Sequence, residues 1–244
     1  MDDPAILEPV AARAWPSARR SDLGGWRLHA ADGFSGRLNA CWPLGEPDRP
    51  PDAAVAAVEA WYAARGLPPV FKLADGATAP ADLAVVLAAR GYRPRTETLM
   101  MTAALPAGEA AAAPVSDRLD DGFLSVFSAT AHDPGDARER IEALERIAPP
   151  RFFARIDVQE RPAAIGACAV EGDWAGVFAM RTAPDRRRQG LARRILDGLF
   201  AAATAAGARR AYLQVEAANA PAVGLYRGLG FETAYAYRYW DRPA

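Results

Sequence analysis

The sequence predicts an α/β (α+β) fold made of two similar halves, and three observations support this prediction. Strand-like and helix-like segments alternate over residues 174–240, and part of the same order recurs over residues 53–102. The chain has 244 residues, of which 51% are hydrophobic and 24% charged, as in a globular protein with a substantial core. Since a typical domain has about 100–200 residues, this length is sufficient for two small domains.

The clearest periodicity lies in the C-terminal half. Residues 174–182 form an apolar run rich in strand-forming residues, and Pro184 follows as a strand breaker. From Leu191, apolar residues recur every three or four positions up to Gly207. This spacing predicts a helix with one buried face.

A second strand–helix–strand unit follows at residues 211–240. Residues 211–215 predict a short buried strand, and Asn219 with Pro221 predicts the start of a helix. Gly230 ends this helix, and the alternating aromatics of residues 233–240 predict a last strand. The apolar residues of the helix are Val223, Leu225, Tyr226 and Leu229.

Upstream segments complete the C-terminal half. Residues 119–129 and 137–147 have helical spacing, and residues 151–158 and 162–170 predict a pair of strands. Residues 103–115, rich in Ala, Pro and Gly, are the best candidate for a linker.

The N-terminal half repeats this pattern. When Gly91-Tyr92 is aligned with Gly230-Phe231, an offset of 139 residues, helix falls on helix and strand on strand. The predicted elements of the first copy are helices at 53–65 and 80–89 and strands at 70–73 and 96–102.

The first copy lacks the residues of the second that point to chemistry. Leu87 stands at the position of Tyr226, and residues 45–51 lack clustered arginines and a central glycine. We therefore expect a degenerate domain, a linker and a catalytic domain, at residues 1–104, 105–115 and 116–244.

Charge and the N-terminus restrict the partners and the compartment. The formal net charge of −1 gives no broad positive field for nucleic acid or an anionic membrane. Residues 1–10 lack the basic and apolar regions of a signal peptide, and no apolar run reaches about 20 residues. We expect a cytoplasmic protein without nucleic-acid or membrane partners.

The cysteines and histidines do not suggest a metal site. Cys41 and Cys168 lie far apart in the sequence, and we expect both to be buried thiols. His29 and His132 are the only histidines, and neither has carboxylates at metal-ligand spacing.

Residues 186–192 (Arg-Arg-Arg-Gln-Gly-Leu-Ala) carry the strongest local signal. A glycine just before a helix lets the backbone approach a ligand closely, and free amides at the helix N-terminus favour anions. The three arginines add charge-assisted donors for phosphate oxygens. The segment therefore predicts a pyrophosphate site, although a solvated loop also explains an arginine run taken by itself.

Two elements resemble those of the GCN5-related N-acetyltransferase (GNAT) superfamily. Arg187, Gly190 and Ala192 match its Q/R-x-x-G-x-G/A motif. The preceding Thr182-Ala183-Pro184-Asp185 resembles the end of the family's strand, although the family more often has valine at the position of Thr182. The second element is a strand, an asparagine, a tyrosine-bearing helix and a closing pair. It is matched by Leu213-Gln214-Val215, Asn219, Leu225-Tyr226 and Gly230-Phe231.

The resemblance covers about residues 116–240 and implies a GNAT fold with a degenerate GNAT-like first half. Its mixed sheet would splay between strands 174–182 and 211–216 to hold acetyl-CoA, with no metal. The pantetheine arm would pair with backbone near Met180 and Thr182, and the pyrophosphate would rest on the amides of residues 187–192. The cofactor-binding residues implied are Met180, Thr182, Arg187, Arg188, Gln189, Gly190, Leu191, Ala192 and Asn219.

The resemblance places Tyr226 near the thioester sulfur. A tyrosine has a pKa of about 10 and a thiol one of about 8.5, so transfer of the tyrosine proton to a thiolate costs roughly 2 kcal/mol. We therefore expect Tyr226 to donate a hydrogen bond to the developing thiolate. The alternative is a core aromatic, although Leu225 and Leu229 are expected to supply the buried face of this helix.

A base or a water chain must take the proton of the acceptor amine. Glu216, at the end of a strand beside the expected cleft, is the first candidate, and Glu171 and Asp173 are others. Each is equally well explained as a solvated charge at a strand end. His132-Asp133 lies where the superfamily contacts its acceptor, and a turn explains this pair equally well.

These residues predict an N-acyltransferase that transfers an acetyl group from acetyl-CoA to a primary amine by direct attack in a ternary complex. The acceptor could be a small molecule or a peptide, and a homodimer is left open. A non-catalytic acyl-CoA-binding sensor or interaction module is the alternative. Nucleic-acid binding through the arginine run is a third and weaker hypothesis.

Overall fold

The computed structural model describes residues 3–105 and 113–243. The first half contains α1 (Pro4–Ala14), β1 (Arg19–Leu23), β2 (Trp26–Ala30), β3 (Cys41–Pro43), α2 (Pro51–Ala63), β4 (Phe71–Ala74), α3 (Leu83–Ala89) and β5 (Arg93–Ala104). The second half contains β6 (Val115–Ser116), α4 (Asp121–Ala129), α5 (Pro134–Arg146), β7 (Arg151–Val158), β8 (Arg161–Glu171), β9 (Trp174–Thr182), the 3₁₀ turn η1 (Pro184–Arg186), α6 (Leu191–Ala205), β10 (Arg210–Glu216), α7 (Ala220–Arg227) and β11 (Glu232–Asp241).

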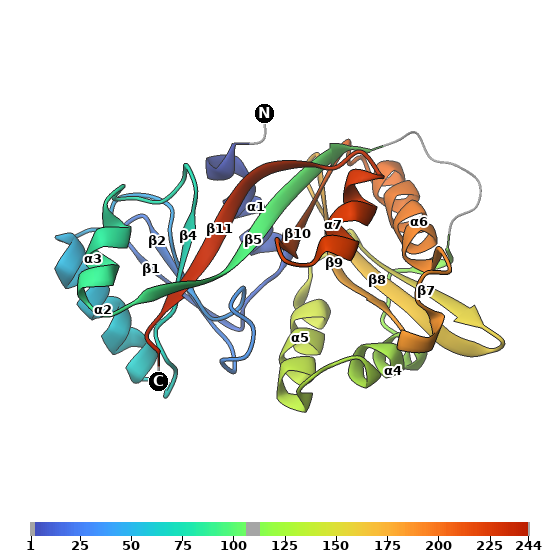
Figure 1. Cartoon of the computed structure of the whole chain (residues 1–244), viewed down its shortest axis with the longest axis horizontal. Coiled ribbons are helices and arrows are strands. Elements are labelled where there is room, and N and C mark those ends of the chain that lie inside the picture. The colour runs from blue at the N-terminus through green and yellow to red at the C-terminus, as the bar shows by residue number, and fades with distance from the viewer. Residues whose placement is uncertain (1–2, 106–112, 244) are drawn as a thin grey trace.

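The strands of the described residues form one mixed sheet, in the order β1-β2-β3-β4-β11-β5-β10-β9-β8-β7-β6. The pairs β3–β4 and β9–β10 are parallel, and the other neighbours are antiparallel. The long strands β5 and β11 run side by side across the middle of the molecule, with α2 and α3 at one end and α4 to α7 at the other (Figure 1). The predicted α/β fold with a mixed central sheet is confirmed.

Strand β5 of the first half lies between two strands of the second. It pairs with β10, with Thr98 opposite Glu216, and with β11, with Thr102 opposite Glu232. Strand β11 then pairs with β4 on its other side. The two halves therefore share one sheet.

The boundary between the halves stays a prediction. Residues 106–112 of the predicted linker lie outside the described part of the chain. On either side of that segment, the amide of Leu105 donates to Arg209 and the amide of Ala113 donates to Arg194.

Side chains of the second half alternate between two cores, as period-two strands require. Phe153 of β7 packs with residues of α1, α4 and α5, whereas its neighbour Ala154 packs with residues of α6 and α7. In the first half, α2 and α3 pack around Trp26 in a third core. Helix α6 buries the face that its spacing predicts, through Leu191, Ile195, Leu196, Leu199, Phe200 and Ala203.

The sequence predictions and the structure agree best in the second half. Residues 151–158 and 174–182 are strands with the predicted bounds, and the helix from residue 191 ends at Ala205. In the first half, α1, β1, β2 and β3 were not predicted. No helix among the described residues is long and apolar enough to cross a membrane.

Both cysteines are free and fully buried, as predicted. Burial raises the pKa of the Cys168 thiol to about 12 and that of Cys41 well above its usual value. Both thiols are therefore protonated at neutral pH and act as small core side chains.

Candidate active site

Strands β9 and β10 separate partway along their length. They pair from Trp174 opposite Arg210 to Val177 opposite Leu213, yet both strands continue for several residues beyond. At the point of separation β9 has a bulge against β8, and Ala179 adopts a φ of +55°. A bulge bends its strand and re-aims its backbone groups, so β9 turns away from β10 here.

A cavity of about 580 Å³ opens at this separation. Of the residues predicted for the site, four line it: Met180, Glu216, Asn219 and Tyr226. Residues from three further regions also line it. They are Trp15, Phe34–Arg37, Arg95, Thr96 and Thr98 of the first half, Phe127 and Arg140 of α4 and α5, and Tyr237 and Tyr239 of β11.

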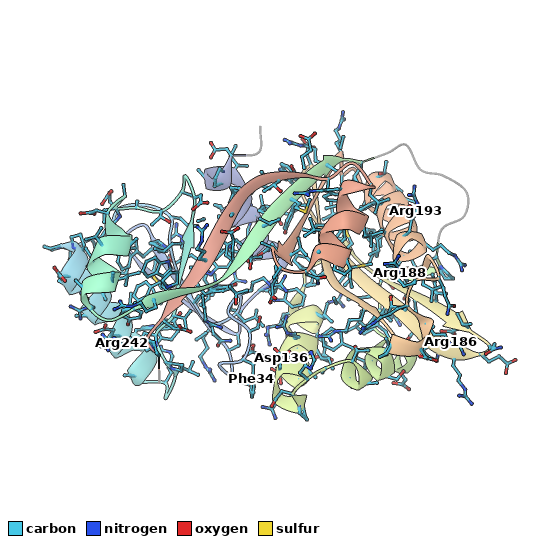
Figure 2. All side chains as sticks on the ribbon, viewed as in Figure 1. Phe34, Asp136, Arg186, Arg188, Arg193 and Arg242 are labelled. Carbon is cyan, nitrogen blue, oxygen red and sulfur yellow. The ribbon has the colours of Figure 1, made fainter. Side chains whose placement is uncertain are left out.

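The predicted pyrophosphate turn follows directly after β9 and does not line this cavity. Arg187, Arg188, Gln189 and Gly190 are exposed, with Arg188 and Gly190 at φ values of +63° and +76°. The N-cap residue of α6 is Gly190, and the described residues supply no side-chain cap there. Figure 2 shows Arg186, Arg188 and Arg193 around this end of the helix. The turn therefore offers free amides and guanidinium groups to an anion.

Three other residues predicted to bind the cofactor, Thr182, Leu191 and Ala192, are at least partly buried and do not line the cavity. Thr182 ends β9, opposite Ala164 of β8. Leu191 is buried and fixes the first turn of α6 in the core, and Ala192 is half-buried beside it. The Leu191 side chain thus anchors the start of α6 in the core.

Tyr226 of α7 lines the cavity and is also part of the core. Its side chain is 8% exposed, and its ring lies 6.0 Å from that of Phe231. Burial raises the pKa of Tyr226 to about 12, and the positive charge of Arg37 partly opposes this shift. Leu225 and Leu229 pack against this core and are partly buried, as expected, but the most buried residues of α7 are Val223 and Tyr226.

The structure separates the three candidate carboxylates. Glu216 is exposed and lines the cavity. Glu171 ends β8 and forms an ion pair of 2.6 Å with Arg13, and Asp173 lies in the turn before β9. Since β9 starts at Trp174 and the separation follows Val177, Glu171 and Asp173 lie at the other end of the strand.

Two polar residues of the cavity wall are held by hydrogen bonds. The Asn219 side chain accepts from the amide of Ala222 at 3.2 Å and so caps α7. The Tyr237 hydroxyl donates to Gln214 Oε1 at 2.8 Å. Both contacts fix the shape of the wall around Tyr226.

His132 and Asp133 lie outside the cavity. His132 lines a separate hollow between α4 and α5. Asp133 caps α5, since its carboxylate accepts from the amides of Gly135 at 2.7 Å and Asp136 at 3.2 Å. The turn explanation therefore accounts for Asp133.

A buried carboxylate of α5 holds one wall of the cavity. Glu139 has no exposed surface, and its two oxygens accept hydrogen bonds from the amides of Asp32, Phe34 and Ser35 and from the Asn39 side chain, at 2.7–3.1 Å. Figure 2 shows Phe34 at the end of α5 that carries Asp136. The loop of residues 32–39, from the first half, is thus fixed on a helix of the second.

Comparison with known proteins identifies the family. A family model described as "Probable histone acetyltransferase Rv0428c C-terminal" matches residues 5–240. The chain belongs to this family, within the GNAT superfamily. It is 27% identical to the "Uncharacterized N-acetyltransferase YobR" of Bacillus subtilis (strain 168), over 98% of each chain.

Solved structures show the same fold. A GCN5-related N-acetyltransferase from Kribbella flavida superposes with a TM-score of 0.70 and 19% identity, over 99% of this chain and 96% of that one. A tandem GNAT protein from the clavulanic acid biosynthesis pathway superposes with a TM-score of 0.59 and 14% identity, over 96% and 86%. The predicted GNAT fold of tandem type is therefore confirmed.

Sequence reasoning missed the residues of this GNAT protein that come from distant segments. Trp15, Arg37, Arg95 and Arg140 belong to no motif, and only the folded chain brings them to the cavity. Trp15 stacks on Phe178 of β9 at 4.9 Å between ring centroids. The sequence around each of these four residues gives no local sign of a role, because they come together at the cavity only when the two halves form one sheet.

Proposed function

We propose that this GNAT protein is an acetyl-CoA-dependent N-acetyltransferase that acetylates a primary amine. The observation that carries the proposal is the separation of β9 and β10, where Tyr226 and Glu216 line one cavity. An opening between two parallel strands next to an uncapped helix N-terminus suits an extended ligand with an anionic end.

The residues fit acetyl-CoA in two respects. The backbone of β9 beyond Val177 lacks a pairing partner in β10, so its amides and carbonyls near Met180 and Thr182 can bond the pantetheine arm. The amides of residues 187–192 and the side chains of Arg187, Arg188 and Gln189 would hold the pyrophosphate. GNAT acetyltransferases use acetyl-CoA, which supports this choice of ligand.

The reaction requires the neutral amine to attack the carbonyl carbon of the thioester. The new C–N bond forms as the C–S bond breaks, and the CoA sulfur leaves with the electron pair. The amine nitrogen gives up one proton, so the products are the amide and CoA. Direct attack needs proximity and support of the developing charges, without a covalent intermediate on the protein.

Tyr226 is proposed to donate a hydrogen bond to the departing sulfur. Because its pKa is raised to about 12, its hydroxyl keeps its proton throughout the physiological range. Full transfer of this proton to a thiolate is uphill. The hydroxyl therefore acts as a fixed donor, in a position that packing against Phe231 keeps constant.

Glu216 is proposed to accept the proton of the amine, directly or through water. It is the candidate carboxylate that lines the cavity, together with four arginines (Arg37, Arg95, Arg140 and Arg181). Positive surroundings disfavour an ammonium ion and so lower the pKa of a bound amine. The cavity thus favours the neutral nucleophile that the reaction requires.

The first half is proposed to form the acceptor side of the site. Loop 34–37 together with Arg95, Thr96 and Thr98 lines the cavity, although the first half lacks its own phosphate turn. We propose that residues 1–104 form the degenerate domain, residues 105–115 the linker and residues 116–244 the catalytic domain.

The test is a CoA-release assay with a panel of amines. Acetyl-CoA is incubated with the protein, with and without each amine, and free thiol and acetylated amine are both measured. Amine-dependent release with one acetylated product per thiol supports the proposal. Binding of acetyl-CoA with only slow, amine-independent hydrolysis would instead support the acyl-CoA sensor, the second candidate.

A further inference from the structure

The charged residues of the cavity wall are unequal in their pairing. Arg95 forms an ion pair of 2.5 Å with Asp241, and Arg140 one of 2.7 Å with Asp136. Arg181 donates to the carbonyl of Thr130 at 2.8 Å and lies over the ring of Phe127. Each of these guanidinium groups therefore already has a partner within the protein.

Arg37 differs from the other three. In the part of the chain that the structure describes, its guanidinium has no ion pair or hydrogen bond, and its contact is with the ring of Trp15, at 5.5 Å from the centroid. Arg37 is half-buried, and its charge acts on the pKa of Tyr226, Tyr237 and Tyr239. Since Arg37 lines the cavity, its charge is available to a ligand bound there.

The backbone at Arg37 is held in place. The preceding Gly36 packs closely against Tyr239. A Cβ atom at this position would lie 2.8 Å from the tyrosine ring, which is too close for a side chain. The amide of Leu38 donates to Ser35 at 2.9 Å, and Glu139 binds the amide of Ser35 at 2.7 Å. A fixed loop thus presents to the cavity a guanidinium without an anionic partner among the described residues, with which a bound anion could pair.

Trp15, whose ring Arg37 contacts, lines the same cavity. Trp15 is 4% exposed, and its Nε1 is buried without a hydrogen-bond partner among the described residues. The Trp15 ring therefore forms a wall of the cavity beside the Arg37 guanidinium.

We infer that the acceptor amine carries a carboxylate and that Arg37 binds this carboxylate inside the cavity. The planar guanidinium matches a carboxylate with two parallel hydrogen bonds. The inference rests on the proposed acetyl transfer and adds the class of acceptor, an amino acid or an amino acid-like molecule. The cavity is lined by four arginines and by the carboxylate of Glu216, so it repels positive charge. Amines with additional positive charges, such as polyamines, should therefore be poor acceptors.

The test compares amino acids with their carboxamides. A series of α-, β- and ω-amino acids, the matching carboxamides and a polyamine are assayed with acetyl-CoA. The wild type should prefer the carboxylate form by about ten- to hundredfold in kcat/KM. Arg37→Ala should abolish this preference, chiefly through KM, and Arg37→Lys should retain part of it. The ratio of the preferences between wild type and variant cancels the different basicity of the two amines.

Controls separate the possible failures. Arg65→Ala, an exposed arginine packed on Trp61 outside the cavity, should keep the preference. Calorimetry with acetyl-CoA and the thermal midpoint show whether each variant is folded; if Arg37→Ala is not, Arg37→Lys decides. A wild type that acetylates amines without regard to the carboxylate, or prefers polyamines, overturns the inference alone. A protein that releases CoA independently of every amine overturns the proposed function.

Discussion

The carboxylate of Glu139 accepts a hydrogen bond of 2.7 Å from the amide of Ser35, 104 residues earlier in the chain. This contact joins α5 of the second half to the loop that carries Arg37. Because Glu139 is fully buried and binds three amides and one side-chain amide, it determines where that loop lies. The position of the acceptor side of the cavity thus depends on one carboxylate outside it.

Replacing Glu139 by glutamine should loosen this loop. The substitution removes one acceptor oxygen and leaves buried amides without a partner, which lowers the free energy of unfolding by about 1–3 kcal/mol. We expect KM for the amine to rise more than the Kd for acetyl-CoA, measured by steady-state kinetics and calorimetry. Glu142→Gln, on the same helix and half exposed, is the matched control and should change stability by less than about 0.5 kcal/mol. Equal effects of both substitutions would contradict the assigned role.

Replacing Tyr226 by phenylalanine should reduce turnover and leave binding intact. The ring still packs against Phe231, but the donor to the leaving sulfur is lost. We expect kcat to fall on the order of 100-fold, with the Kd for acetyl-CoA nearly unchanged. Tyr212→Phe is the control, because the buried Tyr212 hydroxyl has no partner in the described structure and does not line the cavity. Unchanged kcat in Tyr226→Phe would reject the role of this hydroxyl.

Replacing Gly190 by leucine should abolish acetyl-CoA binding. The residue has a φ of +76°, which costs a side chain about 1–2 kcal/mol, and a side chain at the turn would block the approach of a pyrophosphate. A Cβ at Gly190 meets no atom within 4 Å, so the fold should tolerate it. Gly207→Leu carries the same backbone penalty at the other end of α6, also in open space. Loss of calorimetric binding in both variants would show strain instead of a local site.

Replacing Glu216 by glutamine tests the proton acceptor. If this carboxylate takes the amine proton, kcat/KM should fall about 100-fold or more, with the largest deficit at low pH, where free amine is scarce. Glu171→Gln is the control, since Glu171 is ion-paired with Arg13 beside the start of β9, away from the separation. Initial rates between pH 6 and 9 provide the comparison. Equal rates for wild type and Glu216→Gln would assign proton removal to water.

His29 should make the fold sensitive to acid. Burial, together with the charges of Arg20 and Lys72, lowers the pKa of His29 to about 3. The unfolded chain takes up a proton near pH 6.5 while the folded chain does not, so stability falls as the pH drops from about 6.5 toward 3. We expect His29→Gln to remove about 2–3 kcal/mol of this loss between pH 6.5 and 4.5. Urea unfolding at both pH values measures it, with His132→Gln, an exposed histidine, as the control.

The sequence predicted the elements whose signals are local. The proline after residue 182 and the apolar spacing after Leu191 mark β9 and α6, because strand ends and helix faces are encoded within a few residues. The GNAT motif located the turn at Gly190 in the same way. The tyrosine of the second element, Tyr226, lines the cavity. It is also more deeply buried than expected from the interpretation that Leu225 and Leu229 form the buried face of α7.

The remainder depends on contacts that no short segment encodes. Helix α1 contains Pro9 and few strongly apolar residues, and it is stabilised by packing on the second half. Strand β3 has three residues, too few for a periodic pattern. Arg37 lies in a loop whose sequence resembles any polar turn, and its position near Tyr226 follows from Glu139 and Tyr239.

The position of β5 between β10 and β11 also has a consequence during protein synthesis. When the ribosome has completed residue 104, one edge of β4 and both edges of β5 still lack the neighbours that residues 210–241 supply. Unpaired strand edges are templates for association with other chains. The nascent first half therefore presents open strand edges until β10 and β11 are made.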